Sequence, residues 1–267
     1  MSVPGLLAQS RPPEPFDAPG LEIFRPPCLA EWDLAGIHFC VDRGILYMFL
    51  AAAIVIVLFV LAARGGGLVP RGVRNFVESV VDFIREEIAL QVIGHEGRPW
   101  VPFLTAMFCF ILVGNLFGII PGIQFPVNGR IAVPAFMAAL VWVLFNAAGI
   151  RAQGAAYVKN ALFPPGVPKG MYVLLTPIEF VSTFLLRPFT LSVRLLANMM
   201  AGHLILSIFF LGTAYLLAQP STIPFAVPAF ALSVALVGFE ILVAVLQAYI
   251  FTILTAVYIA GAVHPEH

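Results

Sequence analysis

Apolar residues in this chain run in blocks long enough to cross a lipid bilayer, and polar residues interrupt them at few places. The first three blocks cover residues 44–63, 102–120 and 131–150, whereas the last two, 171–217 and 224–263, are about twice the length of one crossing. A helix rises about 1.5 Å per residue and the hydrocarbon core is about 30 Å thick. The pattern therefore predicts five membrane-embedded helices.

The two longest blocks are compatible with two structures. Each block could fold back as a tight hairpin, although neither contains a cluster of turn-forming residues near its middle. Each could instead form one long helix, because excess hydrophobic length is accommodated by tilting or kinking. Periodicity alone does not decide between these alternatives.

Residues 71–92 have a different pattern, in which charged and apolar residues alternate with a helical period. The charged residues are Arg71, Arg74, Glu78, Asp82, Arg85, Glu86 and Glu87. A helix with one charged side and one apolar side is typical of a segment that lies on a membrane surface rather than crossing it. The alternative, a soluble linker, does not explain the amphipathic period, so we expect a surface helix.

Residues 1–40 contain several prolines, which break helices, and lack the apolar core of a signal peptide. We expect this tail to be an extended loop, followed by a membrane domain over residues 41–267. The cysteines, Cys28, Cys40 and Cys109, show no metal-binding spacing. Cys28 and Cys40 could pair if the tail lies outside the cell, but we expect free thiols.

Composition supports the membrane assignment, since 61% of the residues are hydrophobic, 10% are charged, and the mean hydropathy is +0.99. The formal net charge is zero, so nothing indicates nucleic-acid binding. Most basic residues fall in connections on one side of the predicted helices: Arg64, Arg71, Arg74, Arg85, Arg98, Arg151, Lys159 and Lys169. The positive-inside rule then predicts an external N-terminus and a cytoplasmic C-terminus.

Ionisable side chains in the last two apolar blocks are the strongest indication of function. Arg187 and Arg194 are spaced to share a helix face, Asn198 lies one turn beyond them, and His203 lies half a circle away. Placing an arginine at the centre of a bilayer costs about 3 kcal/mol on insertion scales, and arginine stays charged. The second block carries Glu240 and Gln247 with the same spacing.

Structural explanations exist for some of these residues. An asparagine or glutamine can join helices by hydrogen bonds, a lone histidine can be a packing residue, and Arg187 can reach the membrane interface. Arg194 and Glu240 have no charged neighbour within their helices and are harder to explain in this way. Because His203 and Glu240 can both exchange protons, the two helices are candidates for a proton path. No carboxylate of this chain is an evident partner for Arg194, which points to another subunit.

Two motifs carry a family resemblance: SVRLLANMMAGH at residues 192–203 and GFEILVAVLQAYIFTIL at residues 238–254. Together with GNLFG at residues 114–118 and TPIE at residues 176–179, they resemble subunit a of the F-type proton-translocating ATP synthases. The resemblance runs from about residue 40 to residue 262. In this family the last two helices are long and steeply tilted. We therefore expect an all-α integral membrane protein with five embedded helices and one amphipathic surface helix.

The resemblance assigns a role to each polar residue. Arg194 takes the place of the arginine that faces the rotor carboxylate and separates two half-channels. His203 and Glu240 take the place of a proton-carrying pair in the outer half-channel, with acid and histidine exchanged between helices relative to many bacterial members. Further residues match polar or channel-lining positions: Asn198 and Gln247 beside the arginine, Glu179 and Ser182 on the cytoplasmic side, and Asn115 on the proton pathway.

The implied partners are a ring of c subunits, the b subunits of the peripheral stalk, membrane lipid and, indirectly, the F1 sector, in the inner membrane of a bacterium. No cofactor, metal or catalytic site is expected, and the phosphate-binding motif G-x-x-x-x-G-K-[ST] is missing from the sequence. An alternative is a self-contained proton-coupled transporter that uses His203 and Glu240. Such a protein would be expected to show inverted repeats, and none is evident.

Overall fold

The computed structural model describes residues 16, 18–24, 27–34, 37–64, 72–120, 123–154, 156–163 and 169–263. Within these residues, the helical stretches long and apolar enough to cross a membrane are Arg43–Ala63, His95–Leu116, Ala132–Gln153, Tyr172–Leu217 and Ile223–Val263. The prediction of five membrane-embedded helices is confirmed, with ends that differ by a few residues.

The elements follow one another in a simple order. The first are a short helix η1 (Leu21–Phe24), a hairpin of β1 (Cys28–Leu34) and β2 (Ile37–Asp42), α1 (Arg43–Ala63), α2 (Val73–Phe83), the π-helical η2 (Ile84–Ile93), η3 (His95–Trp100) and α3 (Val101–Leu116). The remainder are η4 (Val127–Gly129), α4 (Ala132–Gln153), α5 (Ala156–Leu162), η5 (Lys169–Met171), α6 (Tyr172–Phe180), the π-helical η6 (Val181–Leu186), α7 (Arg187–Leu217) and α8 (Ile223–Val263).

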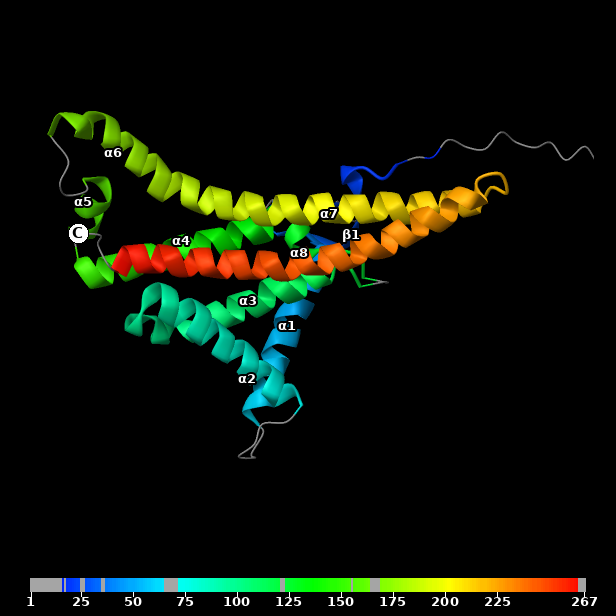
Figure 1. Ribbon diagram of the computed structural model, residues 1–267. Coiled ribbons are helices and arrows are strands. Elements are labelled where there is room, and N and C mark those ends of the chain that lie inside the picture. The colour runs from blue at the N-terminus through cyan, green and yellow to red at the C-terminus, as the bar shows by residue number, and fades with distance from the viewer. Residues whose placement is uncertain are drawn as a thin grey trace, which may run out of the picture.

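The two longest apolar blocks are long helices and not hairpins. Helix α6 continues through η6 into α7, so that residues 172–217 form one helical rod, and α8 returns beside it after a turn at residues 218–222 (Figure 1). The rod and α8 converge toward this turn and diverge toward their other ends (Figure 1). Pro177 and Pro188 lie within or near the start of helical segments without ending the rod, because neighbouring π-helical turns absorb the lost hydrogen bonds.

The hydrophobic core lies where α3, α4, α7 and α8 meet. Its fully buried members include Leu104 and Ile111 of α3, Val141 and Phe145 of α4, Leu195 of α7, and Phe251 and Ile259 of α8. Helix α1 packs against α2 and α3 at one side, and much of its apolar surface is exposed (Figure 1). Exposure of this kind is expected for a helix that contacts lipid.

The predicted amphipathic helix is present as α2 and η2. Arg74 and Glu78 form an ion pair one turn apart, and Asp82 pairs with Arg85 on the same charged side. The apolar side continues into the core, where Ile84 is fully buried. The segment therefore keeps its charges in solvent while its other side packs against α8 and α3.

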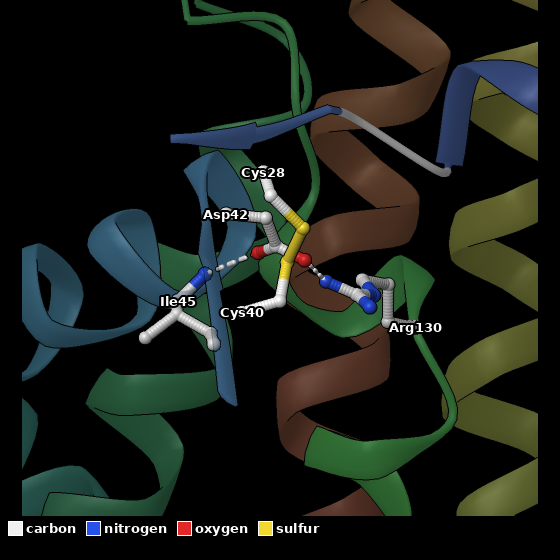
Figure 2. Close-up of a disulfide and its surroundings, with 5 residues drawn as sticks. All are labelled: Cys28, Cys40, Asp42, Ile45 and Arg130. Atoms are coloured by element: carbon white, nitrogen blue, oxygen red, sulfur yellow. Dashed lines mark hydrogen bonds and ion pairs between the residues drawn. A yellow bond between two sulfur atoms is a disulfide. The ribbon is translucent and has the colours of Figure 1, made fainter. Parts of the chain in front are cut away.

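The expectation that residues 1–40 form an extended loop is wrong for part of this segment. Strands β1 and β2 pair in antiparallel fashion and bring the Cα atoms of Cys28 and Cys40 to 5.6 Å, within the range that a disulfide requires. The two residues form a disulfide, so the expectation of free thiols is also wrong (Figure 2). Residues 1–15 lie outside the described residues.

Asp42 joins the hairpin to the membrane helices. Its carboxylate accepts a hydrogen bond of 3.0 Å from the backbone N–H of Ile45 and so caps the N-terminus of α1. The other carboxylate oxygen forms an ion pair with Arg130, which precedes α4 (Figure 2). One buried side chain thereby connects β2, α1 and the segment between α3 and α4.

Residues 151–170, which connect two of the predicted membrane helices, are partly helical where the structure describes them. Helix α4 extends to Gln153, and α5 follows after a glycine in the left-handed conformation, Gly154. The ring of Tyr157 on α5 packs directly on Gly149 of α4, where a methyl group would overlap the ring. Its hydroxyl donates a hydrogen bond of 3.2 Å to Asn146, which fixes α5 on α4.

We predict that Asp42→Ala destabilises the protein by about 2 kcal/mol, because it removes a helix cap and leaves Arg130 without its carboxylate. The melting temperature in detergent micelles, followed by tryptophan fluorescence, should fall by several degrees. Glu31→Ala, which removes an exposed carboxylate from β1 of the same hairpin, is the matched control. Equal melting temperatures for the two variants would contradict this role of Asp42.

Candidate functional site

The polar residues of α7 lie on two different faces of the helix. Arg194 and Asn198 are exposed on one side of the helix, whereas His203 is buried. This arrangement agrees with the half-circle separation predicted from the sequence. A permanent cation and a titratable side chain therefore face different surroundings on one helix.

Arg194 lies among small and apolar exposed residues, including Ala197 and Ala201. Within the described part of the chain, no carboxylate forms an ion pair with its guanidinium. The exposed side chain is therefore open to a carboxylate that approaches this face of α7 from outside the described residues. The small neighbouring residues leave space for a close approach.

Asn198 connects the exposed face of α7 to the interior. Its amide nitrogen donates a hydrogen bond of 2.7 Å to the side-chain oxygen of Gln247 on α8. Gln247 is almost fully buried, and its own amide nitrogen has no hydrogen-bond partner among the described residues. A buried amide N–H is costly to leave unsatisfied, so this group is available to water or a second acceptor.

Glu240 lies two turns before Gln247 on the same side of α8 and is only 6% exposed. Its carboxylate packs against the backbone of α7 at Gly202, where a methyl group would overlap both carboxylate oxygens. The glycine in the SVRLLANMMAGH motif thus provides the space that the carboxylate occupies. Two motifs that are distant in sequence meet at this contact.

His203 follows Gly202 on α7, and groups from two other segments lie beside its ring. The backbone of Gly118 lies within hydrogen-bonding reach of its imidazole, and the ring of Phe24 lies edge-on at 5.7 Å between ring centroids. The Nδ1 atom of His203 is buried and has no partner among the described residues. It is therefore free to exchange a proton with a group or a water molecule that reaches it.

Asn115 belongs to a buried amide pair that the sequence did not reveal. Its oxygen accepts a hydrogen bond of 2.6 Å from Asn128 of η4, and its nitrogen donates to the backbone oxygen of Ala244 on α8 at 3.4 Å. The glycines of the GNLFG motif permit this packing, since a Cβ atom at Gly114 would lie 3.1 Å from the Asn128 amide nitrogen. The oxygen of Asn128 has no partner among the described residues.

Glu179 of α6 and Ser182 of η6 are partly buried and lie toward the opposite end of the rod. Glu179 is about 22 Å from Arg194 along the helix axis, and His203 lies about 13 Å from Arg194 in the other direction. The structure therefore does not bring Glu179 and Ser182 into contact with the other predicted site residues. The polar residues are distributed along the rod, with Arg194 between the two groups.

Arg187 packs against an aromatic ring instead of only extending to the interface. Its guanidinium carbon lies 5.3 Å from the ring centroid of Tyr258 on α8, within cation–π range. Its charge also acts on Tyr157, where burial raises the pKa of the phenol and the nearby Arg187 opposes this rise. The contact with Tyr258 joins the start of α7 to α8.

Several site residues were not identified from the sequence, namely Asn128, Phe24 and Gly202. Asn128 stands before a glycine in a connection, which is also the pattern of an ordinary turn. Phe24 lies in the proline-rich tail and gave no periodic signal. The need for a glycine at position 202 becomes evident only when α8 is packed against α7.

Comparison with known proteins places these features in a family. Residues 45–260 match the family model described as ATP synthase A chain. A subunit a of ATP synthase from Parafrankia sp. (strain EAN1pec) is 46% identical over 250 residues, which cover 93% of this chain and 84% of that protein. The subunit a of Frankia alni is 43% identical over 95% of this chain and 89% of that protein. The subunit a of Rhodococcus erythropolis is also 43% identical, over 94% of this chain and 92% of that protein.

These likenesses extend over the five long apolar helices and over both motifs on α7 and α8. They agree with the resemblance noted in the sequence and identify a multi-pass membrane protein. The chain therefore belongs to the ATP synthase A chain family.

Proposed function

We propose that this chain is the proton-channel stator subunit in the membrane sector of a rotary ATP synthase. Its two half-channels would load and unload protons on the carboxylates of a rotor ring. The observation that carries this proposal is the placement of Arg194 on an exposed face of α7 while the proton-exchanging side chains are buried on other faces. A self-contained transporter would be expected to enclose the charged residues of its proton pathway. The exposure of Arg194 therefore does not support that alternative.

In the outer half-channel, a proton would reach His203 and Glu240 before it passes to the rotor. Support comes from the buried polar atoms without partners among the described residues, on Asn128, His203 and Gln247. Buried polar groups of this kind are commonly satisfied by water, which also conducts protons. Asn198 would complete the route, because it joins buried Gln247 to the exposed face that carries Arg194.

Arg194 would act as the barrier between the two half-channels. Its guanidinium is always protonated, so it repels protons and favours the ionised form of a rotor carboxylate beside it. In the apolar surroundings of a membrane this interaction is much stronger than in water. A rotor carboxylate would therefore lose its proton on reaching Arg194 and take up another after leaving it.

The inner half-channel would contain Glu179 and Ser182. Both lie on the side of Arg194 away from His203 and are partly buried, so they are placed for release of protons toward the other membrane surface. Arg194 lies between the two groups of polar residues along the rod. This order is required of a barrier that blocks a direct leak.

We infer that the N-terminus lies outside the cytoplasm and the C-terminus inside, in the inner membrane of a bacterium. The Cys28–Cys40 disulfide supports an external hairpin, since disulfides persist in oxidising compartments. Basic residues support the same orientation, because Arg64 and Arg151 lie near the helix ends opposite the hairpin. The c-subunit ring would meet the exposed face of α7, and the b subunits and the F1 sector would complete the complex.

We predict that Arg194→Ala abolishes ATP-driven proton pumping in inverted membrane vesicles and raises the passive proton leak after the F1 sector is removed. The reason is that alanine neither repels protons nor ionises a rotor carboxylate. Pumping is measured by quenching of a pH-sensitive acridine dye, and leak by decay of an imposed pH gradient.

Arg64→Ala, at the end of α1, is the matched control because it also removes one arginine but lies away from α7. We expect it to leave both measurements unchanged. Normal pumping and normal leak in Arg194→Ala vesicles would refute the proposed barrier.

We also predict that Gly202→Ala strongly reduces proton pumping, because the added methyl group occupies the position of the Glu240 carboxylate. Gly238→Ala on α8 is the control, since a methyl group there meets nothing within 4 Å. Both changes favour a helix by about 1 kcal/mol, so propensity does not distinguish them. Equal pumping by the two variants, at equal amounts of assembled complex, would show that the Glu240 position is not important.

A further inference from the structure

The N-terminal segment places an aromatic ring directly on the proton-exchanging histidine. Phe24, at the end of η1, is only 6% exposed although it precedes the first membrane-spanning helix. Its ring meets the imidazole of His203 edge-on, with 5.7 Å between the ring centroids. A residue from the tail thus covers a group in the middle of α7.

A specific site receives the Phe24 ring. A Cβ atom at Gly129 of η4 would lie 3.0 Å and 3.1 Å from two carbons of this ring and 3.0 Å from Pro126, so a larger residue there would push the ring or the proline aside by a few tenths of an ångström. The neighbours of Gly129 are Asn128, with its unpartnered side-chain oxygen, and Arg130, which pairs with Asp42. The ring therefore lies between His203 and the polar edge of the η4 segment.

Two further contacts hold the segment in place. The hairpin that follows Phe24 is closed by the Cys28–Cys40 disulfide and attached through Asp42 to both α1 and Arg130 (Figure 2). Before Phe24, the ring of Phe16 contacts Tyr215 near the end of α7, at 5.6 Å between centroids. The segment is thus attached on both sides of Phe24.

We propose that Phe24 is a hydrophobic gate over His203 and that the Cys28–Cys40 disulfide holds this gate closed. A phenyl ring has no group that donates or accepts a proton, so it interrupts any chain of water molecules that passes through its position. While the ring is seated against Gly129, direct access of bulk water and small solutes from the hairpin side to His203 is restricted, and protons of the outer half-channel reach His203 by passing beside the ring or when the ring moves. This inference rests on the proposed proton-channel function, in which His203 belongs to the outer half-channel.

The test measures the accessibility of His203 without any turnover of the complex. Right-side-out and inverted vesicles that contain the assembled complex are treated with diethyl pyrocarbonate, which acylates accessible imidazole nitrogens. The rate of modification at His203 is followed by peptide mass spectrometry after chymotryptic digestion. In right-side-out vesicles we expect Phe24→Ala to raise this rate about tenfold, because it removes the ring that limits local access.

Three further variants separate gating from a general loss of structure. Phe24→Leu keeps an apolar side chain at the position and should stay near the original rate, whereas Gly129→Ala should raise the rate by displacing an intact Phe24. The double variant Cys28→Ser/Cys40→Ser should also raise it by releasing the hairpin. Phe49→Ala, which removes a phenylalanine that is 64% exposed on α1, is the matched control and should leave the rate unchanged.

Rates in Phe24→Ala and Gly129→Ala that equal those of Phe49→Ala would overturn the gate. If Phe24→Ala fails to assemble, the Gly129→Ala rate decides, since that variant retains every side chain of the site. The result is independent of the pumping tests. A gate can be found even if Arg194→Ala refutes the barrier.

Discussion

The permanent charge of Arg194 is the constraint on which the arrangement of the last two helices depends. A guanidinium cannot become neutral inside an apolar helix, so its position must be matched by an external carboxylate or by water. The chain exposes Arg194 on a face with small neighbours and buries the groups that can change protonation on other faces. Because the fixed charge and the titratable groups face different surroundings, α7 can carry both Arg194 and His203.

Close packing around polar side chains is achieved in a consistent way. Glutamate, asparagine and phenylalanine side chains each press against a glycine of a neighbouring segment: Glu240 against Gly202, Asn128 against Gly114, and Phe24 against Gly129. A glycine lacks Cβ and allows another group to approach the backbone. These side chains are therefore held by steric contacts, even where a polar atom such as the Asn128 oxygen has no hydrogen-bond partner among the described residues.

The parts of the fold that depend on local hydrophobic pattern were predictable from the sequence. The five apolar blocks and the amphipathic segment correspond to helices of the structure. The seven-residue spacing of Glu240 and Gln247 correctly predicted that they share one face of α8. The parts that depend on tertiary packing were not. The Cys28–Cys40 disulfide requires strand pairing that a proline-rich tail does not suggest, and helix α5 is stabilised by Tyr157 lying on Gly149. Asn128 has the sequence pattern of a turn residue, and its role depends on the hydrogen bond that its amide nitrogen donates to Asn115.

The length of α8 has a geometric consequence. Its 41 residues extend about 60 Å, whereas a bilayer with its headgroups is about 45 Å thick, so an apolar helix of this length is accommodated by tilting or bending. On a leaning helix, two residues at different depths are also displaced sideways from each other. Any path that follows α7 and α8 would therefore also run sideways within the membrane as it crosses it.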